Sequence, residues 1–487
     1  MEVELKLALD PADIARFRQA RPLAAVKPTV TRVDGVYFDT PDCSLARQGM
    51  ALRLRDAGGA WMQGLKAGRS GTGGLHSRHE WEFESDDHAL DLARFRETPL
   101  ARIDDVATLH KRLHAAFRVT FDRTAWELTP ARGSRLEVAL DVGQVCTADA
   151  AEAICEVEIE CLEGDAWHAF ELAEALMQAA PLRPSIVTKA RRGYRLFRNE
   201  SPQPVHAGDS RVRRDMRAET AARAIVAAAL EQLQGNEEGL LTADDPEFVH
   251  QARVAMRRMR AALRMFAKPI GRTRADAWRR QLGRATRSLG AARDWDVFIT
   301  ETLPSLPATP EVIARARRHQ RRARKAARNS IRSRGYASAI LRVSRWLAAE
   351  PPSHKGAKLE EFAAKLLAKR HARLVADVKN LARASMQARH RTRIDAKRLR
   401  YVVEGLAPAL DRREAKRYSR VLSQLQDALG RANDAVTGRR LLARLKPAAS
   451  LGAFAHDWLA ARIADEGGNL RELAQQIVET KPFWRQA

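Results

Sequence analysis

The sequence predicts an α+β chain of two domains: an N-terminal domain of eight or nine mostly antiparallel strands with helices outside, and an all-α C-terminal domain. Three observations predict it. Apolar and charged residues alternate in short runs over the first 200 residues, which is the period of a strand. Beyond the Pro- and Gly-containing segment 201–212, Ala, Leu and Arg recur at helical spacing instead. Within that second part a charged motif repeats at a fixed offset of 140 residues, which indicates a duplication.

The domain boundaries follow from these changes of pattern. We expect the strand domain at residues 1–200, a linker at 201–212 and the helical domain at 213–487, with two repeats at about 213–345 and 355–487. A chain of 487 residues exceeds what one ordinary hydrophobic core supports, which agrees with two domains.

The first strand is expected at residues 2–9. Glu2, Glu4 and Lys6 point to one face of this strand, and the apolar residues between them point to the other. The segment 154–162 shows the same alternation with three carboxylates on one face. Carboxylates side by side repel each other, so such a face needs a metal cation, basic neighbours or open water.

The remaining elements of this domain can be read from the same periodicity. Strands are expected at about 32–39, 50–57, 60–67, 78–85, 116–131 and 134–142, and helices at about 11–20, 100–115 and 165–180. Closing the strands into a barrel removes their unpaired edges. Charged faces turned outward would give a solvated surface, whereas charged faces turned inward would give a lumen for cations and anions. We favour the inward arrangement, which suits a short phosphate chain bridged by Mg²⁺ or Mn²⁺.

Short motifs follow one another through this domain. They are Glu2-x-Glu4-x-Lys6, Tyr37-Phe38-Asp39-Thr40, Leu52-Arg53-Leu54-Arg55, Gly73-Gly74-Leu75-His76, Arg78-His79-Glu80, Glu137-Val138-Ala139-Leu140-Asp141, Glu156-x-Glu158-x-Glu160 and Lys189-Ala190-Arg191-Arg192-Gly193-Tyr194. In this order they resemble the CYTH domain, the family of triphosphate tunnel metalloenzymes. The resemblance implies an eight-stranded antiparallel tunnel that hydrolyses the terminal phosphate of a triphosphate.

The same resemblance implies roles for individual residues. The implied ligands of Mg²⁺ or Mn²⁺ are Glu2, Glu4, Glu158 and Glu160. The implied phosphate-binding residues are Lys6, Arg53, Arg55, Lys66, Arg78, Arg118, Arg123 and Lys189. The implied catalytic residues are Glu80, Glu82 and Asp141, together with Lys6. Arg118 and Arg123 are five residues apart and would face opposite ways on one regular strand, and the resemblance favours Arg123.

Charge is divided unevenly between the two parts of the chain. Residues 1–200 hold 27 Lys and Arg against 31 Asp and Glu, a net charge of −4; since the whole chain carries +25, the remainder carries +29. A surplus of this size predicts a polyanionic partner, which could be nucleic acid, an anionic membrane or a phosphate polymer.

The repeated motif concentrates this positive charge. The residues His250, Arg253, Arg257, Arg258 and Arg260 recur as His390, Arg393, Lys397, Arg398 and Arg400. Steps of three and four residues place most of each set on one stripe of a helix. Two facing stripes would form a basic trough; the alternative is a solvated helix face, which we expect for the Arg-rich run 315–334. Positive charges at this spacing repel each other and do not stabilise a helix. Their presence in both repeats therefore favours a binding role for the two stripes.

This second part resembles a CHAD domain, a helical module associated with inorganic polyphosphate. The resemblance covers roughly 213–480 and includes Arg293-Asp294-Trp295-Asp296-Val297. It implies that long-chain polyphosphate is a partner. Aromatic residues make up only 6% of the chain, and proteins that bind single-stranded nucleic acid supply stacking rings, so we do not expect a nucleic-acid partner.

We therefore expect metal-dependent hydrolysis of inorganic triphosphate to pyrophosphate and phosphate, with polyphosphate bound by the helical domain. The alternatives are a non-catalytic protein of polyphosphate or its granules, a thiamine or nucleoside triphosphatase, and a class IV-type adenylate cyclase. No apolar run approaches the roughly 20 residues of a membrane helix, and no signal peptide precedes Glu2. We expect a cytoplasmic protein without a membrane partner, with polyphosphate granules as one location.

Overall fold

Contacts divide the chain into two compact units in this computed structural model. The barrel unit comprises Met1–Gln203 together with Arg332–Ala349, and the helical unit comprises Pro204–Ile331 together with Glu350–Ala487. The residues that the structure describes are 2–68, 71–85, 88–130, 133–349, 356–379, 381, 384–464 and 467–485.

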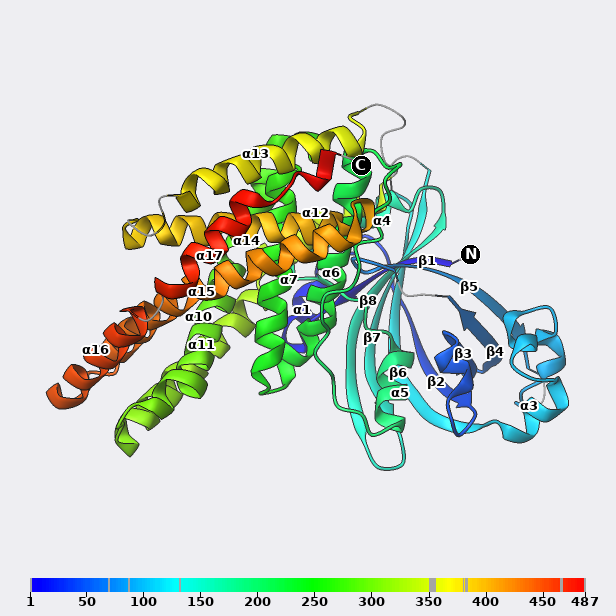
Figure 1. Ribbon diagram of the computed structural model, residues 1–487. Helices are drawn as coiled ribbons and strands as arrows, with labels where there is room; N and C mark the ends of the chain where they lie inside the picture. Colours follow the sequence, from blue (N-terminus) through cyan, green and yellow to red (C-terminus); the bar gives the residue numbers. More distant parts are fainter. Residues whose placement is uncertain are drawn as a thin grey trace. The chain divides into compact units, whose positions relative to one another are not determined.

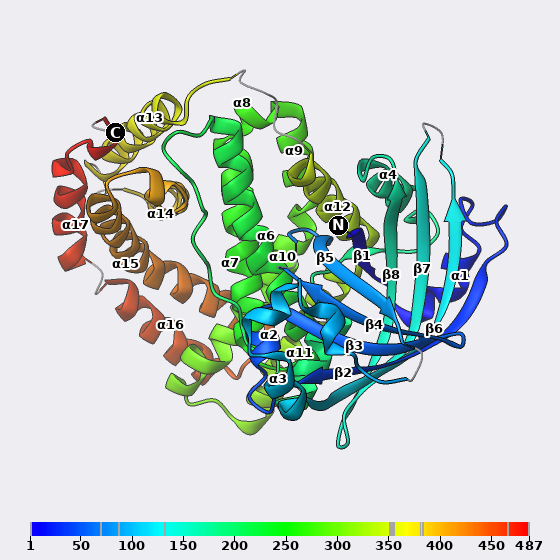
Figure 2. The same ribbon diagram turned by 90° about the vertical axis from the view of Figure 1, so that its right-hand side faces the viewer.

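Among these residues, eight long antiparallel strands form a closed barrel. They are β1 (Glu2–Ala8), β2 (Thr29–Asp39), β3 (Met50–Ala57), β4 (Ala60–Ala67), β5 (Leu75–Glu84), β6 (His114–Leu128), β7 (Arg135–Cys146) and β8 (Ala151–Glu163). Their order is β5-β4-β3-β2-β6-β7-β8-β1, and pairing of β1 with β5 closes the sheet (Figure 2). A two-residue strand, β9 (Arg183–Pro184), pairs with the end of β1. The predicted eight-stranded antiparallel tunnel is confirmed.

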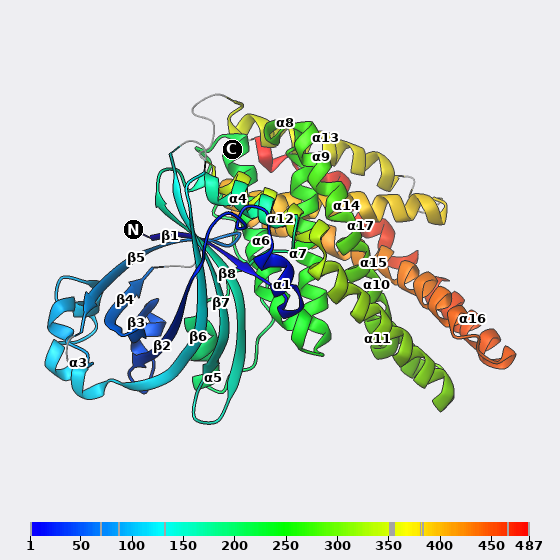
Figure 3. The same cartoon turned by 180° about the vertical axis from the view of Figure 1, so that it is seen from behind.

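Helices cover the outside of the barrel. They are α1 (Ile14–Arg18), α2 (Ser44–Arg47), α3 (Val106–Arg112), α4 (Trp167–Leu176), α5 (Lys189–Phe197) and, from much later in the chain, α12 (Arg334–Ala348). One core joins Leu5 and Val157 of the strands to Phe17 of α1, Phe170 of α4 and Leu341 of α12. Helix α12 lies beside α4 in this unit (Figures 1 and 3). The apolar faces of β1 and β8 are therefore their outer faces.

A second core joins the outer faces of β3 and β4 to α3. It contains Leu52 and Leu65 of the strands and Leu109 of the helix. The helix expected at 100–115 is shorter than predicted, because β6 already begins at His114. There the backbone pairs with the end of β2, and this pairing between distant segments takes precedence over helical periodicity.

Several helices of the helical unit recur at the 140-residue offset. Its helices are α6 (Ala218–Thr242), α7 (Pro246–Met265), α8 (Ala267–Ile270), α9 (Arg272–Gln281), α10 (Gly283–Val297), α11 (Pro310–Arg332), α13 (Leu359–Lys379), α14 (Met386–Leu406), α15 (Arg412–Arg444), α16 (Ala449–Ala464) and α17 (Gly467–Glu479). Moving α7 forward by 140 residues gives almost the bounds of α14, and moving α6 gives a range that overlaps α13. The long helix α15 spans the counterparts of both α9 and α10.

The segment expected to be a linker runs along the helical unit from Pro204 onward. The backbone N–H of Val205 donates to Asn236 Oδ1 at 3.0 Å, and Ser210 Oγ donates to the Gly405 carbonyl at 2.5 Å. Within the described residues, no helix combines the length and the apolar character needed to cross a membrane.

Candidate functional site: a charged barrel lumen and a basic helix pair

The charged faces of the strands point into the barrel. Lys6, Asp141 and Glu156 are each at most 2% exposed, yet they alternate along their strands with residues of the outer core. The inward arrangement that the alternation favoured is the one adopted. Since the lumen is closed by backbone pairing on all sides, its chemistry is set by the side chains that β1–β8 and the start of α5 send inward.

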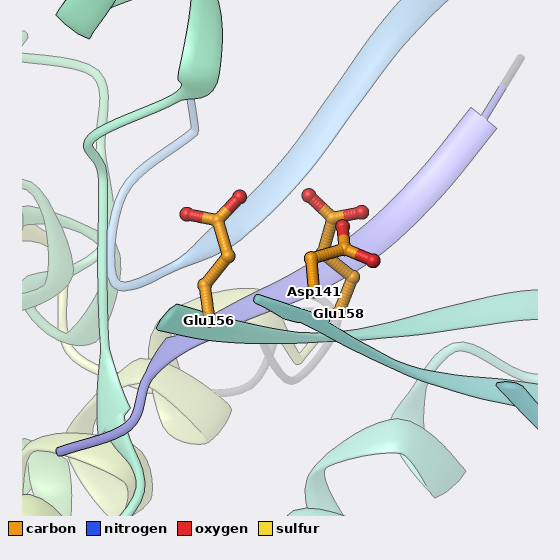
Figure 4. A group of neighbouring side chains, drawn as sticks. All are labelled: Asp141, Glu156 and Glu158. Carbon is orange, nitrogen blue, oxygen red and sulfur yellow. The ribbon is translucent and has the colours of Figure 1, made fainter. Parts of the chain in front are cut away.

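Three carboxylates meet on the inner face of β7 and β8. Ligand oxygens of Asp141, Glu156 and Glu158 all lie within 4.8 Å of one another, and the side chains project from the same face of the sheet (Figure 4). We call this set the three-carboxylate cluster. It forms because Asp141 on β7 is the direct cross-strand partner of Glu156 on β8, and Glu158 follows two residues later on the same face.

Three cations interleave with these carboxylates. Lys189, the first residue of α5, places Nζ 2.6 Å from Asp141 Oδ2, 2.6 Å from Glu156 Oε1 and 3.0 Å from Glu158 Oε1. Lys6 Nζ lies 2.7 Å from Glu156 Oε1 and also contacts Glu158. Arg123 holds Asp141 through two bonds, Nε–Oδ1 at 2.8 Å and Nη2–Oδ2 at 2.7 Å, and reaches Glu158 Oε2 at 2.7 Å.

This interleaving favours the charged forms of Glu156 and Glu158. Burial by itself would raise the pKa of Glu158, but attraction from Lys189, Lys6 and Arg123 holds it well below the ordinary value. Burial opposes the charged form of Lys189 as well, and the carboxylates raise its pKa well above normal. Glu158 and Lys189 thus stabilise each other's charged forms inside the lumen.

A second set of charges lies on β3, β4 and β5. Arg53 Nη2 is 2.9 Å from Glu80 Oε1 and 2.9 Å from Glu82 Oε1, Arg55 Nη2 is 2.9 Å from Glu82 Oε1, and Lys66 Nζ is 3.0 Å from Glu80 Oε2. Repulsion from Arg53 is the main reason that the pKa of Arg55 is lowered, and burial and Arg123 add to it. Arg55 and Arg123 therefore act on each other across the same lumen.

A further pair of carboxylates extends the acidic surface. Glu4 of β1 is 9% exposed and is the direct cross-strand partner of Glu160 of β8. Like charges directly opposite each other destabilise a sheet, and a divalent cation between them would relieve the repulsion. The donors here are all carboxylate oxygens, which are the ligands that Mg²⁺ and Mn²⁺ prefer. The residues present therefore fit a hard divalent cation.

The two repeated stripes of the helical unit lie on α7 and α14, which pack against each other. Arg253, Arg257 and Lys397 are half-buried, and no ion pair to a carboxylate is found for them among the described residues. The pKa of Lys397 is lowered to about 6, first by burial and then by repulsion from Arg257, Arg393, Arg253 and Arg400. Burial is also the main reason that the pKa of Arg257 falls to about 10. We call Arg253, Arg257, Arg393 and Lys397 the basic cluster.

A glycine lies against the basic cluster in each repeat. A Cβ atom at Gly290 of α10 would lie 3.6 Å from Arg253 Nε, and one at Gly430 of α15 would lie 3.4 Å from Arg393 Nη2. These two glycines are themselves related by the 140-residue offset. A methyl group at either position would be in ordinary contact with the guanidinium group of its own repeat, so only a larger side chain would crowd it.

The other members of the repeated motif are placed less symmetrically. Arg398 pairs with Asp395 and Arg400 pairs with Glu404, each at 3.0 Å. Arg258 and Arg260 are half-buried, with a pKa lowered mainly by burial. The remaining two are His250, which is half-buried, and His390, which is exposed.

Comparison with known proteins agrees with this two-part architecture. The family model of the CYTH domain matches residues 1–194, and that of the CHAD domain matches residues 224–443. The chain joins a CYTH domain to a CHAD domain. A Haemophilus influenzae protein named inorganic triphosphatase is 29% identical over 207 residues, which are 40% of this chain and 54% of that protein. The chain thus matches about half the length of this relative.

The CHAD domain also has a structural counterpart. A crystal structure of the CHAD domain from the plant Ricinus communis is 29% identical, covers 58% of this chain and 99% of that chain, and superimposes with a TM-score of 0.52.

Most residues that the CYTH resemblance implies do meet in the lumen. Those in contact with the three-carboxylate cluster or belonging to it are Lys6, Arg123, Asp141, Glu158 and Lys189; those in the second set are Arg53, Arg55, Lys66, Glu80 and Glu82. Arg78 lies beside them on β5, where its Nη2 is 3.2 Å from His76 Nδ1. The side chain of Glu2 lies outside the described residues, although β1 begins at that position.

Arg118 is the exception among the expected phosphate-binding residues. Its side chain is 57% exposed and pairs with Asp34, because five steps along β6 turn it to the face opposite Arg123. Arg118 therefore lies outside the lumen, and only Arg123 is retained. Sequence reasoning also left Glu156 without a role, although the alternation of β8 places it on the same face as Glu158.

Proposed function

We propose that the CYTH domain hydrolyses the terminal phosphoanhydride bond of inorganic triphosphate with Mg²⁺ or Mn²⁺. The supporting observation is the lumen, in which lysines and arginines from β1, β3, β4, β6 and α5 converge inside one closed barrel beside acidic groups. A short, highly charged phosphate chain is the ligand that such a lumen fits. The relative named inorganic triphosphatase supports the same reaction class.

The chain's own residues would act mainly by position and charge. Phosphoryl transfer develops charge on the transferred group, and preorganised cations stabilise that charge without rearranging during the reaction. Arg53, Arg55 and Lys66 would hold one part of the substrate, and Lys6 and Lys189 another. Glu80, Glu82 and Asp141 keep the arginines, Lys66 and Lys189 in fixed orientations through the ion pairs described above, and Glu156 and Glu158 do so for Lys6.

A divalent cation would be held by Glu4, Glu158 and Glu160. The CYTH resemblance implies Glu2 as a further ligand, but its side chain lies outside the described residues. When bound, it would neutralise phosphate oxygens and polarise the phosphoryl group. Because Glu4 is the cross-strand partner of Glu160, the two carboxylates could share one ion. The carboxylates of the three-carboxylate cluster, Glu158 among them, are paired with Lys6, Lys189 and Arg123.

The test is phosphate release from tripolyphosphate with Mg²⁺ or Mn²⁺. Glu4→Gln and Glu160→Gln should each lower the rate on the order of 100-fold. Asp34→Asn is the matched control, since Asp34 pairs with Arg118 on the outer face and should leave the rate unchanged. Rates equal to wild type in both glutamine variants would contradict the assignment. Thiamine triphosphate, nucleoside triphosphates and formation of cyclic AMP, measured in parallel, decide between the triphosphates and a cyclase.

We also infer that the CHAD domain binds inorganic polyphosphate through the basic cluster, which would place the protein on polyphosphate granules. The supporting observation is a set of half-buried basic side chains on α7 and α14, which includes Arg253, Arg257 and Lys397. Burial and mutual repulsion disfavour their charged forms in the absence of a bound anion. Labelled polyphosphate should bind more tightly than DNA or RNA at matched phosphate and salt, and Arg257→Ala should weaken it. Arg317→Ala on the exposed face of α11 is the control. A preference for nucleic acid would overturn the inference.

A further inference from the structure

A helix from inside the stretch matched by the CHAD family is built into the barrel unit. Helix α12 falls within residues 224–443, but Arg332–Ala349 groups with the barrel by contacts. Its Ala337 and Leu341 are at most 1% exposed and lie in the same core as Leu5 and Leu7 of β1. The outer face of the strand that carries Lys6 is therefore covered in part by a segment more than 300 residues later in the chain.

Ion pairs fix this helix to α4. Arg342 Nε lies 2.7 Å from Glu174 Oε1, and Arg345 Nη2 lies 2.9 Å from Glu171 Oε1. The Arg345 guanidinium also stacks over the Trp167 ring, 3.9 Å from its centre. A stacked arginine with a carboxylate partner is held in one orientation, which defines how α12 is rotated on the barrel.

The same helix meets the loop before β5. Ser344 is 1% exposed, and a Cβ atom at Gly73 would lie 2.3 Å from its Oγ and 2.6 Å from its Cβ. Gly73 has φ +76° and Gly74 has φ +88°, a backbone conformation that favours glycine. The backbone of Gly73 in the loop thus contacts the small side chain of Ser344 on α12, and the contact has no space for a larger group at either position.

That loop in turn holds the backbone of Lys6. The Lys6 N–H donates to the Gly74 carbonyl at 2.8 Å, and the Lys6 carbonyl accepts from the Ser185 N–H at 2.9 Å. A Cβ at Gly74 would lie 2.8 Å from the Lys6 oxygen and 2.9 Å from Pro184 Cβ. The loop at 73–74 and the segment at 184–185 therefore grip Lys6 along one edge of β1, the edge away from β8, and α12 packs against both of them.

We propose that α12 is a positioning element of the lumen. It supports the loop at Gly73–Gly74 and strand β9, which hold the backbone of Lys6 so that its Nζ reaches Glu156 and Glu158. The barrel site is then complete only with this later segment, and residues 1–203 by themselves lack part of their core. The effect on hydrolysis rests on the proposed triphosphatase function; the effect on Lys6 does not.

The experiment uses the full chain with Ser344→Leu, which overfills the contact with Gly73. Amide hydrogen exchange should become faster at Lys6 and Ser185, the two donors of the grip, and stay unchanged in the paired strands β6 and β7. Hydrolysis of tripolyphosphate should fall by about tenfold to a hundredfold in kcat/KM, as expected when a binding group is displaced by about 1 Å. Ala348→Leu is the matched control, since it adds the same side chain at an exposed position of α12.

A second variant guards against a general folding defect. Arg345→Ala removes the stacking and the ion pair to α4 without adding volume, and it should produce the same local pattern more weakly. If amide exchange at Lys6 and Ser185 is as slow in Ser344→Leu and Arg345→Ala as in Ala348→Leu, the proposal is wrong. It is also wrong if exchange becomes faster to the same extent throughout the barrel, because that result indicates a structural role only. If the wild-type chain hydrolyses no triphosphate, the exchange measurement still decides the role of α12.

Discussion

Two arginines on one strand offer a matched test of the inward and outward faces of the barrel. Arg123 makes two bonds to Asp141, which is fully buried, and one to Glu158, while Arg118 makes an ion pair with Asp34 at the surface. Removing one partner of a buried pair destabilises by about 3–5 kcal/mol, because it leaves a buried charge behind. Lys189 remains to neutralise Asp141, so we expect about 3 kcal/mol for Arg123→Ala. An exposed pair contributes at most about 1 kcal/mol.

In a domain of this size, 1 kcal/mol corresponds to about 2–4 °C in Tm, so Arg123→Ala should lower the unfolding temperature of the barrel by about 6–12 °C. Arg118→Ala should lower it by no more than about 4 °C. Scanning calorimetry of the full chain measures the unfolding temperature of both variants. The transition of the barrel is the one that shifts when tripolyphosphate is added. Equal shifts in the two variants would refute the reasoning that the inner face carries the coupled charges.

Three further predictions concern the two charge clusters. Burial would raise the pKa of Glu158, but its cationic neighbours lower it well below 4.5. The stability that ionised Glu158 contributes is therefore present above about pH 4.5 and is lost as the pH falls through the lowered pKa. When urea unfolding midpoints are measured between pH 6 and pH 3, Glu158→Gln should weaken their dependence on pH. The pKa of Lys397 is lowered from 10.5 to about 6 by burial and nearby arginines. Between these two pH values the unfolded state binds more protons than the folded state, so the free energy of unfolding of the helical unit should rise from pH 6 to pH 9. Urea unfolding should show this rise in the wild type and not in Lys397→Met. Gly430→Leu should displace Arg393 and weaken polyphosphate binding about tenfold in a titration. Gly452→Leu is the control, because a Cβ atom at Gly452 meets nothing within 4 Å, and it should bind polyphosphate as the wild type does. Equal affinities of the two variants would show that Arg393 is not a binding group.

Much of this architecture could be predicted from local pattern. Alternation along β1 and β8 predicts both the strands and the face that carries charge, because successive side chains of a strand point opposite ways whatever surrounds it. The 140-residue offset predicts the correspondence of α7 and α14 for a similar reason, since residues that recur at the same helical spacing lie on the same face of a helix. The end of the helix at 100–115 was predicted incorrectly, because pairing of His114 with β2 is a contact between distant segments.

The sequence by itself determined which side chains share a face, and hence that acidic and basic groups would be concentrated on the inside of a closed sheet and along two helices. Only the tertiary structure decided which of these groups meet: that Glu156 joins Asp141, that Arg118 is turned away, and that α12 completes the barrel. Helical periodicity shows that α12 has an apolar face but not what covers it. The contact between Gly73 and Ser344 depends on shape complementarity between segments 271 positions apart, and no local pattern encodes it.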